Sequence, residues 1–322
     1  MRIPLPTHVD QAVAAAVRAP SPLNTQPWRF VVDRDRIEVW LDRGRVLRIA
    51  DPDAREARLS CGAAMFNLMI SLRSNGKTLA LRVLPKPDEP DLLAELEIDG
   101  DRFSSPEERR LAEVVFRRHT NRRPFLDRPV PVWARTTLRA AALVEGGLLE
   151  LFGRGDRANA VARVLNRAEA AQARNGAFQA EIALWTRRTA NAPDGVQAPT
   201  GPPPAHRIPA QESFVTAESK SESEGGEPVL GAVLTADGGP AADLRAGMVL
   251  QRVLLTATAA GLATSFVGRP FETPETRAAM DRIFADLGRP HTVVRFGYGR
   301  PVPMTARRQV GEVLLRRSEA SL

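Results

Sequence analysis

The residues best suited to chemistry lie in one short polar segment near the start of the chain. Ser21, Asn24 and Gln26 alternate there with prolines, and Trp28 follows at the head of an apolar run. Prolines restrict the backbone, while a hydroxyl and two amides offer hydrogen-bond donors and acceptors together. Such a rigid loop suits a flat heterocycle with alternating donors and acceptors. An ordinary capped turn before a strand is the alternative.

A second segment carries the charges that would suit a phosphate. Arg118 and Arg122 flank His119 and Thr120 in the densest basic run of the chain. Two guanidinium groups on one short segment can each bind a phosphate through paired hydrogen bonds. A solvated basic end of a helix explains the same residues equally well, because helix C-termini favour cations.

Both segments resemble signature sequences of a known family. Pro20-Ser21, Asn24 and Gln26-Pro27-Trp28 match the Pro-Ser-x-x-Asn-x-Gln-Pro-Trp signature of the nitroreductase superfamily of FMN-dependent oxidoreductases. The segment 118–122 resembles the family's Arg-Arg-Ser-x-Arg motif, with Thr120 in place of the serine and far from the N-terminus. The resemblance implies that the first loop lies against the isoalloxazine ring and that the second segment holds the phosphate and ribityl chain.

The last third of the chain adds matches of lower specificity. Residues 260–268 resemble the family's Gly-Leu-Gly-Thr segment, and residues 294–299 resemble its closing strand and Gly-Tyr-Pro turn, with glycine replacing the proline. Arg307-Arg308 resembles a downstream basic pair that reaches the phosphate. The resemblance implies no catalytic side chain, because FMN carries the chemistry. The cofactor-binding residues that we predict are Pro20, Ser21, Asn24, Gln26, Arg118, His119, Thr120, Arg122, Phe266, Val267, Gly268, Arg307 and Arg308.

Hydrophobic periodicity predicts the elements that must position these residues. Helices are expected over residues 9–17, 54–74, 131–144, 156–188, 243–260 and 274–287, with a further helix that begins at a Ser-Pro-Glu-Glu capping box at residue 105. Strands are expected over residues 28–32, 37–41, 78–84, 92–98, 148–152, 229–234 and 293–296, with a short apolar run over residues 262–267 and an extended tail from residue 297. This pattern predicts an α+β fold.

The order of the motifs predicts a tandem duplication. The ring loop occurs once in the first half and the phosphate motif and basic pair once in the second, while the segments 51–76 and 237–261 resemble two copies of one family helix. We therefore expect a nitroreductase-like single-chain pseudo-dimer with long helices around antiparallel sheets, divided into residues 1–104 and 105–322, with one intact site. The arrangement resembles the Acg-type subgroup, which implies one FMN, often under a lid.

The segment 191–228 is the expected lid. It is rich in Pro, Gly, Ser and Glu, and its Asp194-Gly195-Val196 resembles the subgroup's Asp-Gly-Ile-type turn. An open site implies ping-pong reduction of a nitroaromatic, a quinone or a similar acceptor by NAD(P)H through FMN. A closed site implies a protein that binds or sequesters FMN with little turnover. The physiological acceptor, the choice between NADH and NADPH and any further association of pseudo-dimers stay open.

Composition limits the other function classes. The 322 residues carry a net charge of +7, so a basic interaction module is the third alternative, but the arginines are mixed with acidic residues and aromatic residues make up only 5%. We expect no nucleic-acid or membrane partner. Cys61 is the single cysteine and the four histidines are scattered, which argues against a disulfide or a metal site. Together with an N-terminus that lacks a secretory signal pattern, this predicts a cytoplasmic protein. Cys61 is expected to pack in the core, with a reactive thiol as the alternative.

Overall fold

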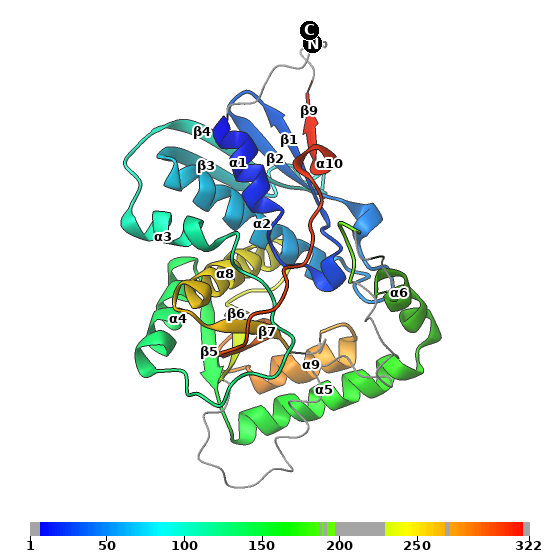
Figure 1. Cartoon of the computed structure of the whole chain (residues 1–322). Coiled ribbons are helices and arrows are strands. Elements are labelled where there is room, and N and C mark those ends of the chain that lie inside the picture. The colour runs from blue at the N-terminus through cyan, green and yellow to red at the C-terminus, as the bar shows by residue number, and fades with distance from the viewer. Residues whose placement is uncertain (1–6, 187–188, 190–191, 197–228, 268–270, 318–322) are drawn as a thin grey trace.

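The computed structural model of the chain describes residues 7–186, 189, 192–196, 229–267 and 271–317, and it contains two sheets (Figure 1). The first sheet has the order β3 (Lys77–Val83), β4 (Leu92–Asp101), β2 (Arg36–Leu41), β1 (Trp28–Asp33) and β9 (Leu314–Arg316). The second has the order β5 (Leu148–Phe152), β6 (Val229–Thr235), β8 (Arg289–Gly297) and β7 (Ala263–Phe266). Pairing is antiparallel except between β1 and β9. The predicted α+β class is confirmed.

The helices cover the sheets and separate them. Figure 1 shows α1 and α2 beside the first sheet, α5 and α9 beyond the second, and α8 between the two halves. The longer helices are α1 (Thr7–Ala16), α2 (Arg55–Ser74), α3 (Pro106–Val114), α4 (Val132–Val144), α5 (Asp156–Arg174), α6 (Gly176–Thr186), α8 (Pro240–Ala259) and α9 (Pro274–Ile283). At the start of α3 the predicted capping box is present, since Ser105 Oγ accepts from the Glu108 amide at 3.1 Å.

The two halves share one topology. In each half we count from the edge strand that follows the long helix, which is β3 after α2 and β7 after α8. The strand order is then β3-β4-β2-β1 in the first sheet and β7-β8-β6-β5 in the second. In each half a helix precedes the first strand, and a 20-residue helix, α2 or α8, connects the second strand to the third. Apart from α5 and α6, which lie between β5 and β6, and α9, which lies between β7 and β8, the second half repeats the order of elements of the first, which supports the predicted duplication.

The long helices α2 and α8 cross at two glycines. A Cβ on Gly62 would overlap the Leu244 carbonyl oxygen, and a Cβ on Gly247 would overlap the Leu59 carbonyl oxygen. Each glycine thus faces the carbonyl three residues before the other glycine, as a twofold relation requires. Only glycine lets two helix backbones approach this closely. The crossing joins the two halves through a tightly packed contact.

Two predicted elements differ from the structure. The expected helix over residues 156–188 breaks at Asn175, whose backbone is extended, and the chain resumes as α6. Asparagine followed by glycine is a poor helix pair, and the break lets Phe178 of α6 pack beside Leu23, Leu47 and Ala50.

The tail from residue 297 is not merely extended. It carries the short helix α10 (Val310–Val313) and then β9, which pairs in parallel with β1 of the first sheet. Figure 1 shows this red segment running from the second sheet up to the first. The second half therefore completes the sheet of the first, because an edge strand with unpaired backbone groups accepts another strand readily.

We expect Gly247→Ala to destabilise the fold by about 3 kcal/mol, because overpacking at a backbone contact outweighs the better helix propensity of alanine. The measurement is the urea unfolding midpoint. Gly311→Ala in α10 is the matched control, since its Cβ would meet no atom within 4 Å. Equal stability of the two variants would show that the crossing tolerates a side chain.

Candidate functional site

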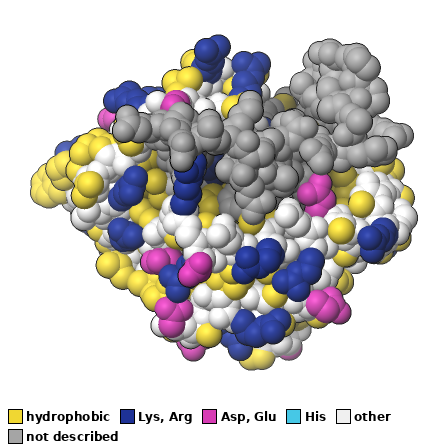
Figure 2. Space-filling view, turned by 90° about the horizontal axis from the view of Figure 1, so that it is seen from below, with side chains coloured by type: hydrophobic (Ala, Val, Ile, Leu, Met, Phe, Trp, Pro, Cys, Tyr) yellow, Lys and Arg dark blue, Asp and Glu magenta, His cyan; other side chains and the backbone are white. Residues whose placement is uncertain are grey.

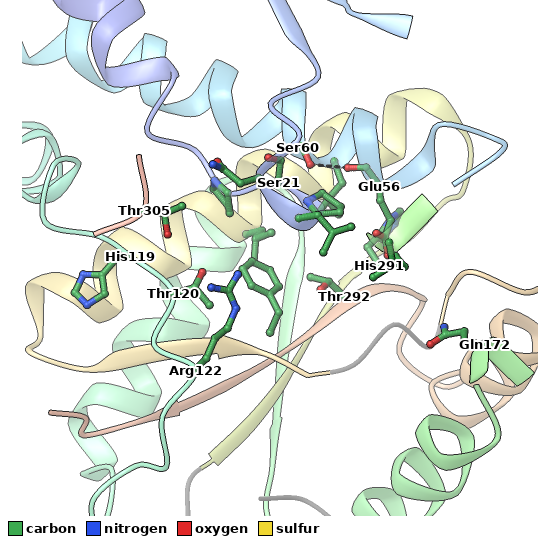
Figure 3. A pocket seen from close by; sticks show the side chains of 18 of the residues that line it. Ser21, Glu56, Ser60, His119, Thr120, Arg122, Gln172, His291, Thr292 and Thr305 are labelled. Carbon is green, nitrogen blue, oxygen red and sulfur yellow. Dashed lines mark hydrogen bonds between the residues drawn. The ribbon is translucent and has the colours of Figure 1, made fainter. Parts of the chain in front are cut away.

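A cavity of about 320 Å³ lies between the two halves. Its walls come from the loop after α1, from α2, from the segment after α3, from α5 and α6, and from β7, β8 and the C-terminal tail. In Figure 3, Ser21 lies on the side opposite Thr120 and Arg122. The volume is in the range of small-molecule sites. The cavity is therefore composite, and neither half could form it alone.

The loop between α1 and β1 has a strained backbone. Leu23, Asn24 and Gln26 all have positive φ angles, of 49°, 56° and 53°. Non-glycine residues adopt this conformation at a cost and mostly where the surroundings impose it. Ser21 helps to hold the loop, because its Oγ accepts from the Gln26 amide at 2.9 Å. Strain of this kind is typical of functional loops.

The amides of this loop bind neighbouring backbone. Asn24 Nδ2 donates to the Gly195 and Ala306 carbonyls at 3.2 and 3.1 Å, and the buried Asn24 Oδ1 accepts no hydrogen bond from the residues that the structure describes. Gln26 Nε2 donates to the Pro193 carbonyl at 2.8 Å, and Gln26 Oε1 accepts from the Arg308 amide at 2.9 Å. Asn24 thus keeps one acceptor beside the cavity, whereas Gln26 is committed to the tail and to residues 192–196.

Arginines converge on the C-terminal end of α1. Arg118 is only 1% exposed, and its Nη2 donates to the Arg18 carbonyl at 2.7 Å. Arg307 reaches the Ala19 carbonyl at 3.3 Å. Arg118 Nε and Nη1, Arg18 Nε and Arg307 Nε are buried and have no hydrogen-bond partner among the described residues. Buried N–H groups are rarely left unpaired, so an acceptor brought by a bound ligand would satisfy this cluster.

The electrostatics of the cluster indicate an anion. Burial, together with the neighbouring charge of Arg18, lowers the pKa of Arg118 to about 10. Burial and the charges of Arg118, Arg18 and Arg122 hold the pKa of Arg307 well below its usual range. When arginines lower one another's pKa in this way, a bound anion stabilises their charged forms. Arg18, which ends the turn just before the Pro20-Ser21 motif, was not among the predicted residues.

The segment that carries the phosphate motif is anchored to the second half. The amide of Asn121 donates to the Thr264 carbonyl at 2.8 Å, and Asn121 Nδ2 donates to the Arg300 carbonyl at 2.9 Å. Thr120 forms an isolated bridge with Thr264 of β7. This buried asparagine therefore fixes the motif against β7 and the tail.

Most of the predicted site residues meet at the cavity. Gln26, Val267 and Arg308 do not line it, and Gly268 lies outside the described residues. The Val267 amide donates to the Val293 carbonyl at 3.0 Å, and Arg308 donates to the Glu312 carbonyl at 2.6 Å. The predicted residues that line the cavity are Pro20, Ser21, Asn24, Arg118, His119, Thr120, Arg122, Phe266 and Arg307.

The opposite end of the cavity was not found from the sequence. Figure 3 shows Glu56, His291, Thr292 and Gln172 there, away from His119, Thr120 and Arg122. These residues come from α2, β8 and α5, and none of them belongs to the predicted cofactor-binding segments. Each is a single polar side chain on an amphipathic element, and such a residue forms no sequence pattern that indicates a site. The residues come together only in the folded chain.

Helix α6 closes one side of the cavity. Phe178 and Ile182 line it, and the Glu181 carboxylate accepts from the Ile49 and Ala50 amides at 3.2 and 2.9 Å. Arg45 forms an ion pair with Asp194 and stacks over the Trp185 ring at 5.6 Å. These contacts bind α6 and residues 192–196 to the first half, over the ring loop. The rest of the expected lid, apart from residues 192–196, lies outside the described residues.

Other site types find no support in the part of the chain that the structure describes. No three His, Cys, Asp or Glu side chains gather there as metal ligands. Burial raises the pKa of the Cys61 thiol, whose Sγ lies 3.2 Å from the Pro27 carbonyl, as expected for a core residue. No helix within the described ranges is long and apolar enough to cross a bilayer. On the face seen in Figure 2, described basic and acidic side chains are interspersed.

Comparison with known proteins identifies relatives along nearly the whole chain. Rv3131 of Mycobacterium tuberculosis, named as a candidate NAD(P)H nitroreductase, is 31% identical and covers 95% of this chain and 90% of its own length. Acg of the same organism, also named as a candidate NAD(P)H nitroreductase, is 29% identical and covers 95% of this chain and 94% of its own. No family model matches the chain.

Solved structures show lower similarity. A nitroreductase-like family protein from Bacillus cereus matches 66% of this chain and 96% of its own with a TM-score of 0.38 and 17% identity. A nitroreductase with bound FMN from Bacteroides fragilis matches 59% and 88% with a TM-score of 0.36 and 13% identity. TM-scores this low do not support a family assignment, so the assignment depends on the relatives found by sequence, Rv3131 and Acg. With 31% identity to Rv3131 over 95% of its residues, the chain belongs to the nitroreductase family.

Proposed function

We propose that the chain is an FMN-dependent oxidoreductase that uses NAD(P)H to reduce a nitroaromatic, a quinone or a similar acceptor. The observation that carries the proposal is the set of buried guanidinium N–H groups of Arg118, Arg18 and Arg307 that find no partner in the described part of the chain, beside the strained ring loop. Family membership supports the same cofactor class, and the names of Rv3131 and Acg support NAD(P)H as the reductant.

The chemistry of the cavity fits a flavin nucleotide. A phosphomonoester supplies several strong acceptor oxygens, which match the orphaned donors of Arg118 and Arg307. The cavity continues past the Pro20–Asn24 loop, where Ser21 and the free Asn24 Oδ1 offer polar groups. Phe266 offers an apolar surface on the β7 side. One cavity thus offers cationic side chains for a phosphate and polar and apolar groups for a flat ring.

The positions of these residues support a separate role in FMN binding for each group of them. Arg118, Arg18 and Arg307 would neutralise the phosphate, and His119 and Thr120 would contact the ribityl chain. Ser21 and Asn24 would orient the ring, while Gln26 positions the tail from behind the loop. When bound, FMN supplies two-electron redox chemistry, and the protein contributes binding, orientation and electrostatics.

A single site per chain follows from the unequal halves. In the first half, eleven residues (17–27) connect α1 to β1, and they include the ring loop. In the second half, only residues 145–147 connect α4 to β5. There is no room in that short turn for a second set of ring contacts. We therefore propose a fused pseudo-dimer of the Acg type with one FMN.

A second candidate function is FMN binding with little turnover. It is favoured by the contacts that bind α6 to the first half, namely the Glu181 carboxylate on two backbone amides and the Arg45–Asp194 pair. These contacts lie over the ring loop, and Phe178 fills the space beside Leu23. A helix fixed in this way would exclude NAD(P)H from the ring.

We expect Arg118→Gln to weaken FMN binding by about 1.5–3 kcal/mol, the contribution of a charged hydrogen bond, and to leave riboflavin binding unchanged. Riboflavin lacks the phosphate, so the difference isolates the phosphate contact. The measurement is quenching of flavin fluorescence on titration of flavin-free protein. Arg307→Gln is expected to behave in the same way.

Arg308→Gln is the matched control, because Arg308 follows Arg307 in the chain but does not line the cavity. It is expected to bind FMN within about twofold of the unchanged protein, since no phosphate hydrogen bond is lost. A larger loss for Arg308→Gln than for Arg307→Gln would contradict the assignment of the phosphate contacts.

Anaerobic addition of NADPH or NADH to the yellow protein distinguishes the two candidate functions. We expect the visible flavin absorbance to bleach, because hydride transfer requires the nicotinamide to reach the ring. The flavin of Glu181→Gln should bleach faster if α6 limits the access of the nicotinamide to the ring. Glu113→Gln, at an exposed position of α3, is the matched control. Flavin that bleaches on photoreduction but not with either nucleotide would favour the occluded protein.

A further inference from the structure

Two separate segments of the chain supply the arginines that would bind the phosphate. Residues 117–126, which we call the motif arm, follow α3 and carry Arg118 and Arg122. Residues 298–309, which we call the tail arm, follow β8 and carry Arg307. One phosphate can contact both arms only if they lie at a fixed distance from each other. A common phosphate site therefore requires a contact that joins the two arms.

Charge alone would separate the two arms. Burial and then the charge of Arg118 hold the pKa of Arg307 well below its usual range, so the two guanidinium groups repel each other in a poorly solvated space. Figure 3 shows Thr120 of the motif arm and Thr305 of the tail arm on the same side of the cavity. Before a ligand binds, neutral contacts must hold the arms together against this repulsion.

Asn121 joins the two arms. It is 2% exposed, its Nδ2 donates to the Arg300 carbonyl of the tail arm at 2.9 Å, and its Oδ1 accepts from the Arg123 amide of the motif arm at 3.1 Å. Its own amide donates to the Thr264 carbonyl of β7 at 2.8 Å. All three partners are backbone groups, so these hydrogen bonds fix the course of both arms against the second sheet.

Gly299 makes room for the Asn121 side chain. A Cβ on Gly299 would lie 2.5 Å from Asn121 Nδ2 and 3.0 Å from the Ala263 Cβ, so a larger residue would displace the amide. Position 299 is also where glycine replaces the proline of the Gly-Tyr-Pro turn that this segment resembles. Proline has a Cβ as well and would meet the same amide. The contact between the arms thus needs both Asn121 and Gly299.

We propose that Asn121 is a positioning residue for the cofactor phosphate and that Gly299 is the neighbour that this role requires. Asn121 does not line the cavity. It acts through the two arms, because its hydrogen bonds set the distance between Arg118 and Arg307 at which one phosphate satisfies both. The inference depends on the proposed function, since it concerns the phosphate end of the same cavity.

FMN and riboflavin together separate positioning from stability. Riboflavin lacks the phosphate, so the ratio of its dissociation constant to that of FMN measures the phosphate contribution alone. The flavin-free full chain is titrated with each flavin, and quenching of flavin fluorescence gives both constants. Asn121→Ala and Gly299→Ala are each expected to lower the ratio about tenfold, near the lower end for one charged hydrogen bond, while riboflavin binding changes less than about twofold.

A double variant tests whether the two residues act through one contact. The Cβ that Gly299→Ala adds meets the Asn121 amide in the unchanged chain but not in Asn121→Ala. Residues that act through the same contact have non-additive effects, so Gly299→Ala should lower the ratio less than about twofold further in the Asn121→Ala chain. The product of the two single effects would instead indicate two unrelated losses.

Gly231→Ala is the matched control for overpacking. Gly231 lies in β6 of the same sheet, where a Cβ would lie 2.8 Å from the Phe296 ring and 2.9 Å from Leu149 Cδ1. It belongs to neither arm and does not line the cavity. Gly231→Ala is therefore expected to lower the urea unfolding midpoint and to leave the ratio of the two dissociation constants unchanged.

The outcomes distinguish the inference from the proposed function. A ratio that falls with Arg118→Gln but not with Asn121→Ala or Gly299→Ala overturns the inference alone, and so does an equal fall with Gly231→Ala or full additivity in the double variant. If one single variant does not fold, the other decides, and failure of both overturns a positioning role. A chain that takes up no FMN, or whose ratio Arg118→Gln leaves unchanged, overturns the proposed function and the inference with it.

Discussion

The close approach of α2 and α8 is the constraint on which the rest of the structure depends. Gly62 and Gly247 let each helix contact the backbone of the other, so the crossing admits no side chain at either position. The two halves share one strand order and the contacts at the two glycines are reciprocal, which supports the proposed pseudo-dimer. At the cavity, the loop after α1 meets the segments of β7, β8 and the tail. The cavity lies between the two halves that this crossing joins.

The buried arginines of the site repel one another, and this repulsion raises the free energy of the protein without a ligand. Arg118 is buried, two of its nitrogens find no partner within the described ranges, and its neighbours Arg18 and Arg307 are also positive. The carbonyl groups at the end of α1 offset part of this cost, since Arg118 and Arg307 both donate to them. An anionic ligand would supply the rest. Ligand binding and stability are therefore coupled, and the chain should be most stable when loaded.

The sequence predicted most of the elements. It also singled out Arg118, Arg122 and Arg307, which all line one cavity, while their contact with a phosphate stays a prediction. Strands such as 28–32 and 148–152 and the α2 helix were found because one polar turn or cap bounds each apolar pattern. The break at Asn175, the strand β9 and the polar end around His291 were missed. Each depends on packing between distant segments, which periodicity does not record. The role of Gln26 also differs, because its amide bonds to residues 193 and 308 rather than lining the cavity.

A crystal structure of the FMN-loaded protein tests the central claim most directly. The account predicts one flavin per chain, with its phosphate within hydrogen-bond distance of Arg118 and Arg307 and its ring against the loop that holds Ser21 and Asn24. It also predicts that the nitrogens of Arg118 that now lack partners will bind phosphate oxygens. A flavin bound elsewhere, or bound with those guanidinium groups still unpaired, would contradict the account.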